Sequence, residues 1–125
     1  MTSAFASGEM VRGILQSGDI TTAAPVVLYD QATGAAVTLA TGNVFVIYAI
    51  LVSNGDSASV ITIFDDADGD GVVDTGETIF KQSMAANVLS GFTFERGFGL
   101  TRVPKAKASA ASANTSITIL GEVIK

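Results

Sequence analysis

The sequence contains no cysteine and no histidine, and these two absences exclude several kinds of chemistry. Without cysteine the chain can form neither disulfides nor thiolate metal sites. Without histidine it lacks the commonest general base, so a serine or cysteine nucleophile activated by histidine is impossible. No paired-carboxylate motif stands outside one acidic segment. We therefore expect a protein that is not an enzyme.

Charged residues and long apolar runs are also scarce. Only 15% of the residues are charged, whereas 48% are hydrophobic. The longest apolar run, Val44 to Val52, is far shorter than the roughly 20 residues of a membrane helix. The first eight residues lack the basic start and the apolar run of a signal peptide. We expect no membrane association, a flexible arm over residues 1–8, and a single domain over residues 9–125.

The formal net charge of −5 has its origin in one segment. Six of the 12 acidic residues lie within residues 65–77, and seven Lys and Arg balance the others. The only basic cluster comprises Arg96, Arg102, Lys105 and Lys107, with one aromatic residue among them. Segments that bind nucleic acid usually interleave several aromatic residues for base stacking. We interpret the cluster as a solvated face and expect no nucleic-acid partner.

The rest of the chain has the composition of short strands punctuated by Gly, Asn and Asp. The segments rich in Val, Ile, Thr and Phe are residues 9–17, 19–29, 36–40, 44–52, 58–64, 77–84, 90–96, 99–104 and 115–124. Residues 105–113 have no apolar stripe larger than Ala, which indicates a loop or a flat polar strand. Asn54-Gly55 predicts a hairpin between its neighbouring strands. Together these features predict an all-β fold, an antiparallel, jelly-roll-like sandwich of two sheets and about eight strands.

The run from Val44 to Val52 is apolar on both faces of the expected strand. In a two-layer sandwich every strand has an outward face, so an apolar outward face needs a cover. Either a long loop folds over it or another subunit binds there. Because few residues are left over for a covering loop, we expect a homo-oligomer.

The most specific chemical feature is the segment from Asp66 to Glu77. It fills every constrained position of the twelve-residue calcium loop D-x-[DN]-x-[DN]-G-x5-E. Carboxylates at alternate positions converge on a cation as the chain curls, and Gly71 permits the sharp turn. All-oxygen ligands favour Ca²⁺, with Mg²⁺ or Mn²⁺ second. The predicted ligands are Asp66, Asp68, Asp70, the backbone carbonyl of Val72, Asp74 and Glu77.

This segment resembles the calcium loop of the EF-hand family, and the resemblance covers twelve residues. Its flanks, residues 60–64 and 78–80, have the composition of strands, whereas that family places the loop between two helices. The resemblance therefore implies a calcium loop on a β scaffold, as in some bacterial surface-protein modules. The alternative is an acidic hairpin turn without a metal, since Asp-Gly pairs are common in turns.

Three further segments, residues 42–47, 50–55 and 118–122, resemble small β-sandwich proteins of tailed-phage virions, in particular head decoration or cement proteins. This resemblance rests on pattern and spans about residues 8–125. It implies a structural role on the capsid surface, a trimeric assembly, and the major capsid protein as partner. The alternative function is a calcium-stabilised adhesin or binding module of a bacterial surface or extracellular protein.

Overall fold

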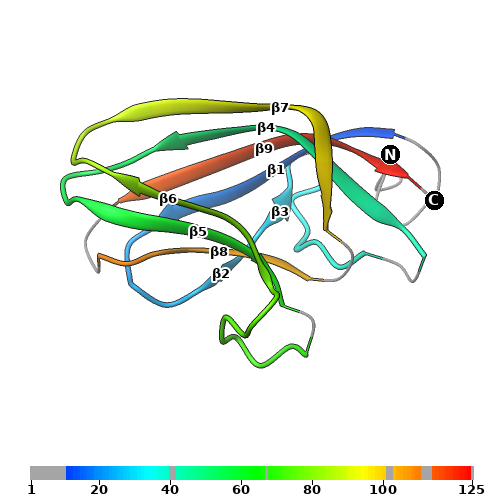
Figure 1. Ribbon diagram of the computed structural model, residues 1–125, viewed down its shortest axis with the longest axis horizontal. Helices are drawn as coiled ribbons and strands as arrows, with labels where there is room; N and C mark the ends of the chain where they lie inside the picture. Colours follow the sequence, from blue (N-terminus) through cyan, green and yellow to red (C-terminus); the bar gives the residue numbers. More distant parts are fainter. Residues whose placement is uncertain (1–10, 40–41, 67, 101–102, 111–113, 125) are drawn as a thin grey trace.

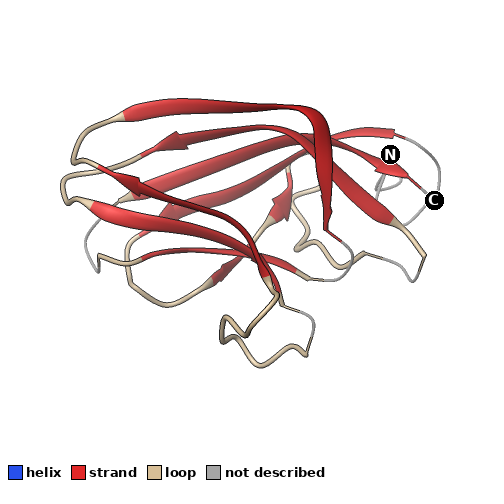
Figure 2. Cartoon of the chain, viewed as in Figure 1, coloured by secondary structure: helices blue, strands red, loops and turns tan. Residues whose placement is uncertain are grey.

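The structure is a computed structural model that describes residues 11–39, 42–66, 68–100, 103–110 and 114–124. These residues form strands, turns and loops without any helix (Figure 2), so none of them belongs to a helix able to cross a membrane. The strands are β1 (Val11–Ile20), β2 (Val26–Val27), β3 (Tyr29–Asp30), β4 (Val44–Ser53), β5 (Ser59–Asp65), β6 (Thr78–Met84), β7 (Leu89–Leu100), β8 (Pro104–Ala108) and β9 (Thr115–Ile124). The predicted all-β class is confirmed. The arm predicted over residues 1–8 lies outside the described residues.

The strands form two antiparallel sheets that pack as a sandwich (Figure 1). One sheet has the order β3-β1-β9-β4-β7 and the other has the order β2-β8-β5-β6. When the two-residue strand β3 is set aside, each remaining strand has one neighbour from the other half of the chain in a nested pattern: β1 with β9, β2 with β8, β4 with β7, and β5 with β6. This is the order produced when one long antiparallel ribbon rolls up into two Greek keys. The topology is therefore that of a jelly roll.

The hairpin predicted at Asn54-Gly55 is wrong. Strand β4 belongs to the five-stranded sheet and β5 to the four-stranded sheet, so the connection crosses between sheets. Neither residue has the positive φ that a two-residue hairpin turn requires. Instead, the buried Asn54 side chain donates to the carbonyls of Ser57 and Ala85 and accepts a hydrogen bond from Thr115. The side chain joins two inter-sheet loops to the start of β9.

Three other segments differ from the sequence prediction. The strand expected at residues 19–29 does not form as one element, because β1 continues to Ile20, residues 21–25 lie outside any strand, and β2 begins at Val26. The strand expected at residues 90–96 and the beginning of the one expected at residues 99–104 belong to a single strand, β7, which bends sharply partway along (Figure 1). The partners of Ile47 and Ala49 on β7 are Phe98 and Thr93, so a large bulge replaces the expected break. Of the strand expected at residues 36–40, the described residues 36–39 form one isolated bridge, between Ala36 and Tyr29.

Strand β8 occupies the first part of the segment where a loop or a flat polar strand was expected. Its burial alternates, with Pro104, Ala106 and Ala108 buried and the two lysines between them half-buried. Small alanine side chains suit this position because they face the crowded space between the sheets. The strand alternative is therefore confirmed for residues 105–108, although one face of this strand is buried.

The hydrophobic core lies between the two sheets. Inward side chains alternate with outward ones along β9, and along β4 on either side of the irregularity between Ile47 and Ala49, as expected for strands with one covered face. The fully or almost fully buried core residues include Phe45, Ile47, Ile50, Val52, Ile61, Ile63, Ala106, Ala108, Ile117, Ile119 and Val123. At the edge where β6 and β7 lie, Phe80 makes edge-on ring contacts with Phe92 and Phe94, which also pack against this core.

Candidate metal centre

The acidic segment forms a loop that connects β5 to β6 and projects from one end of the sandwich (Figure 1). Strand β5 ends at Asp65 and β6 begins at Thr78, so both flanks are strands, as the sequence predicted. The backbone of Asp66 donates to the carbonyl of Val103, which precedes β8. The loop therefore begins at a position fixed by two neighbouring strands.

The loop curls because side-chain oxygens accept hydrogen bonds from backbone amides a few residues further on. Asp68 accepts from the amide of Asp70 at 3.3 Å, and Asp70 accepts from that of Val72 at 2.9 Å. Gly69 and Gly71 adopt φ values of 72° and 75°. A Cβ at either glycine would meet no atom within 4 Å, so backbone conformation alone selects glycine there. The sharp turn predicted at Gly71 is confirmed.

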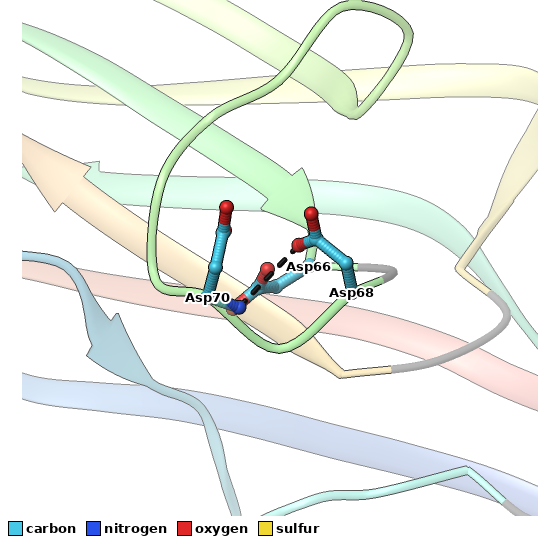
Figure 3. Close-up of side chains that lie close together, drawn as sticks. All are labelled: Asp66, Asp68 and Asp70. Carbon is cyan, nitrogen blue, oxygen red and sulfur yellow. Dashed lines mark hydrogen bonds between the residues drawn. The ribbon is translucent and has the colours of Figure 1, made fainter.

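The carboxylates gather in two groups that share one member. Ligand atoms of Asp66, Asp68 and Asp70 lie within 4.8 Å of one another, and so do those of Asp68, Asp74 and Glu77. Figure 3 shows the first group inside the curl of the loop. The structure thus places all five carboxylates predicted from the spacing in one or both of two overlapping groups, each of which could hold a metal ion. Val72 lies in the same loop with its side chain exposed, and its carbonyl remains a predicted ligand.

Glu77 closes the loop at its far end. Its side chain is buried, and Oε1 accepts a hydrogen bond from the amide of Asp74 at 2.8 Å. Its backbone accepts from the amide of Asp65 at 3.0 Å, next to the start of the loop. These contacts hold the backbone of the last predicted ligand beside Asp65, the residue that precedes the first one.

Asp66 is the most unusual member of the cluster because its carboxylate is only half satisfied. The residue is 1% exposed. Its Oδ2 accepts hydrogen bonds from Lys105 Nζ at 2.6 Å and from the amide of Gly71 at 3.0 Å. Its Oδ1 is buried without any hydrogen-bond partner. A buried carboxylate oxygen normally has a partner, so a bare one within an acidic cluster fits a cation site.

The electrostatics of the loop differ between its two ends. The hydrogen bond from Lys105 holds the pKa of Asp66 below its usual value, although burial acts in the opposite direction. A hydrogen bond shared with Asp68 raises the pKa of Asp74 to about 6, and burial and the charges of Asp70 and Glu77 act in the same sense. At neutral pH the loop therefore concentrates negative charge that a cation would relieve.

Lys105 is the site residue that sequence reasoning missed. It was assigned to a solvated basic face with Lys107, yet only 17% of its side chain is exposed and it forms an ion pair with Asp66. The two residues are 39 positions apart, and no local spacing links them. Only the register of β5 with β8, in which Asp65 lies opposite Pro104, places them together.

No protein-family model matches the chain, and no curated protein is significantly similar to it.

Proposed function

We propose that this chain is a non-enzymatic structural protein whose acidic loop binds a calcium ion that stabilises the fold. The observation that carries the calcium proposal is the buried, unpartnered Oδ1 of Asp66 inside a cluster of carboxylates. The donors are all oxygen atoms, and the glycine positions match those of a calcium loop. Ca²⁺ suits such a set better than Mg²⁺, which prefers to keep several waters.

We further propose that the protein assembles through the outer face of its five-stranded sheet. Tyr48, Leu51 and Leu120 on β4 and β9 are 37%, 47% and 45% exposed. In the strand register Leu120 lies beside Ala49 on one side and Ile14 on the other. These residues form an apolar band, and their exposure supports the subunit alternative for β4 over a covering loop.

The proposed setting is a phage virion, where the protein would decorate or cement the capsid as a homo-oligomer, in particular a trimer. The resemblance of residues 42–47, 50–55 and 118–122 supports this setting. Jelly rolls also occur among viral capsid domains, which supports it by analogy of fold alone. The proposed partner is the major capsid protein, whose lattice would bind each oligomer through repeated weak contacts.

Oligomerisation is tested by light scattering on the wild type and two lysine variants. The wild type is expected to have a mass of several 12.7 kDa subunits at micromolar concentration. Leu51→Lys places a charge in the apolar band and should yield monomers. Gln82→Lys is the matched control, because Gln82 is exposed on β6 of the other sheet. A monomeric wild type, or an unchanged Leu51→Lys oligomer, would contradict the proposed interface.

Capsid attachment is tested by co-sedimentation of the protein with capsids from its own source, followed by negative-stain imaging. The virion proposal predicts saturable attachment and added density on the capsid surface. Failure to co-sediment would reject this setting and favour the second candidate, a calcium-stabilised module of a bacterial surface protein. That candidate is favoured by one observation, the position of the calcium-type loop between two strands of a β-sandwich.

A further inference from the structure

Lys105 and the acidic loop meet at a single carboxylate, and the arrangement has two opposite consequences. Lys105 follows the first residue of β8 and lies opposite Phe64 of β5 in the strand register. Side chains alternate along β5, so Phe64 faces away from Ile63 and the core between the sheets. Phe64 is nevertheless fully buried. The lysine stem therefore lies on a covered face, which restricts where its ammonium group can reach.

The ammonium group and a cation would occupy different oxygens of Asp66. Lys105 Nζ is 2.6 Å from Oδ2, which also accepts from Gly71, whereas Oδ1 remains buried and unpartnered. Both oxygens are bonded to one carbon, so an ion on Oδ1 would lie a few ångströms from the lysine charge. Lys105 thus leaves Oδ1 of Asp66 available as a metal ligand, but its positive charge repels a cation bound to that oxygen.

The same charge stabilises the loop when no metal is bound. Five carboxylates in one loop repel one another, and an unpaired buried carboxylate is costly. Lys105 forms an ion pair with Asp66, which is the most buried of these carboxylates. This ion pair holds Asp66 in place when no metal is bound.

We propose that Lys105 is a built-in counter-cation that keeps the metal-free loop folded and sets a low affinity for the divalent ion. The proposal rests on the proposed calcium function of the loop and adds the residue that tunes it. Repulsion between a unit charge and a divalent ion at this range corresponds to about tenfold in affinity even at the dielectric constant of water. Weak binding of this kind suits a site that is filled only where calcium is abundant.

The test compares Lys105→Met with Lys107→Met, which removes the same charge two residues further along the same face of β8. Calcium binding is measured by titration calorimetry, and thermal unfolding is followed in calcium-free buffer. Lys105→Met should bind calcium at least about tenfold more tightly than Lys107→Met and unfold at a lower temperature without calcium. Added calcium should remove most of this difference in unfolding temperature.

Two further variants separate the lysine charge from its hydrogen bond. Lys105→Gln keeps a hydrogen-bond donor for Asp66 but carries no charge, so it should also bind calcium more tightly than the wild type does. It provides the affinity measurement if Lys105→Met does not fold. Lys105→Arg keeps the charge and should remain close to the wild type. Equal or weaker calcium binding by Lys105→Gln would overturn the role assigned to Lys105. A wild type that shows no calcium binding would instead reject the calcium function itself.

Discussion

Replacement of Asn54 by alanine tests how the end of the sandwich opposite the acidic loop is held together. The Asn54 side chain makes three hydrogen bonds, to Ser57, Ala85 and Thr115, at 3.0, 2.9 and 2.7 Å. Each is worth about 1 kcal/mol, and the Thr115 hydroxyl, which is fully buried, would lose its acceptor. Asn54→Ala should therefore lower the free energy of unfolding by about 3–4 kcal/mol. This is a large part of the stability of a typical domain, which is about 5–15 kcal/mol.

The measurement is urea unfolding followed by far-ultraviolet circular dichroism. Asn87→Gly is the control, because Asn87 lies in a neighbouring loop, is exposed, and has a φ of 60° that glycine adopts without strain. It should change stability by less than about 0.5 kcal/mol. Thr115→Val should cost less in the Asn54→Ala background than in the wild type, because the two side chains share one hydrogen bond. A loss below about 1 kcal/mol in Asn54→Ala would refute this account of the loop cluster.

Two other perturbations test the packing of the sheets and the charge of the loop. Gly121→Ala should destabilise the fold by about 3 kcal/mol or more in urea unfolding, because its Cβ would collide with the Val46 carbonyl. Gly91→Ala is the control and should be nearly neutral, since its Cβ would meet only one side-chain atom, at 3.8 Å. Equal effects of the two substitutions would contradict the β4–β9 register. Because Asp74 has a pKa raised to about 6 from 3.8, the folded metal-free protein binds this proton more tightly than the unfolded chain does. Its stability should therefore fall as pH rises from about 4 to about 6, and Asp74→Asn should remove that part of the decline in unfolding temperature. The same slope in both proteins would contradict the assigned interaction.

The sequence predicted those parts of the fold whose signals are local. The central strands β4 and β9 were placed within a residue or two, because their apolar runs and their Gly and Asn boundaries do not depend on the rest of the chain. The five clustered carboxylates were likewise identified from spacing, since a twelve-residue loop positions its own side chains.

The parts that were missed depend on tertiary contacts. Asn54-Gly55 has the composition of a hairpin turn, yet the buried contacts of Asn54 with Ala85 and Thr115 favour a crossing between the sheets. The break expected near residue 97 is a bulge within β7, whose pairing with β4 continues beyond it. The ion pair of Lys105 with Asp66 arises from strand register, which local composition does not encode.

The central claim, a calcium ion bound by the acidic loop, is tested most directly by thermal unfolding of the wild type and Glu77→Gln with and without calcium. At 100 times the dissociation constant, calcium should stabilise the wild type by about 2.7 kcal/mol, which raises the unfolding temperature by roughly 10 °C. Glu77→Gln, which retains an oxygen that can accept from the amide of Asp74, should keep its β spectrum but lose most of this shift. Identical unfolding temperatures of the wild type in chelator and in millimolar calcium would contradict the claim.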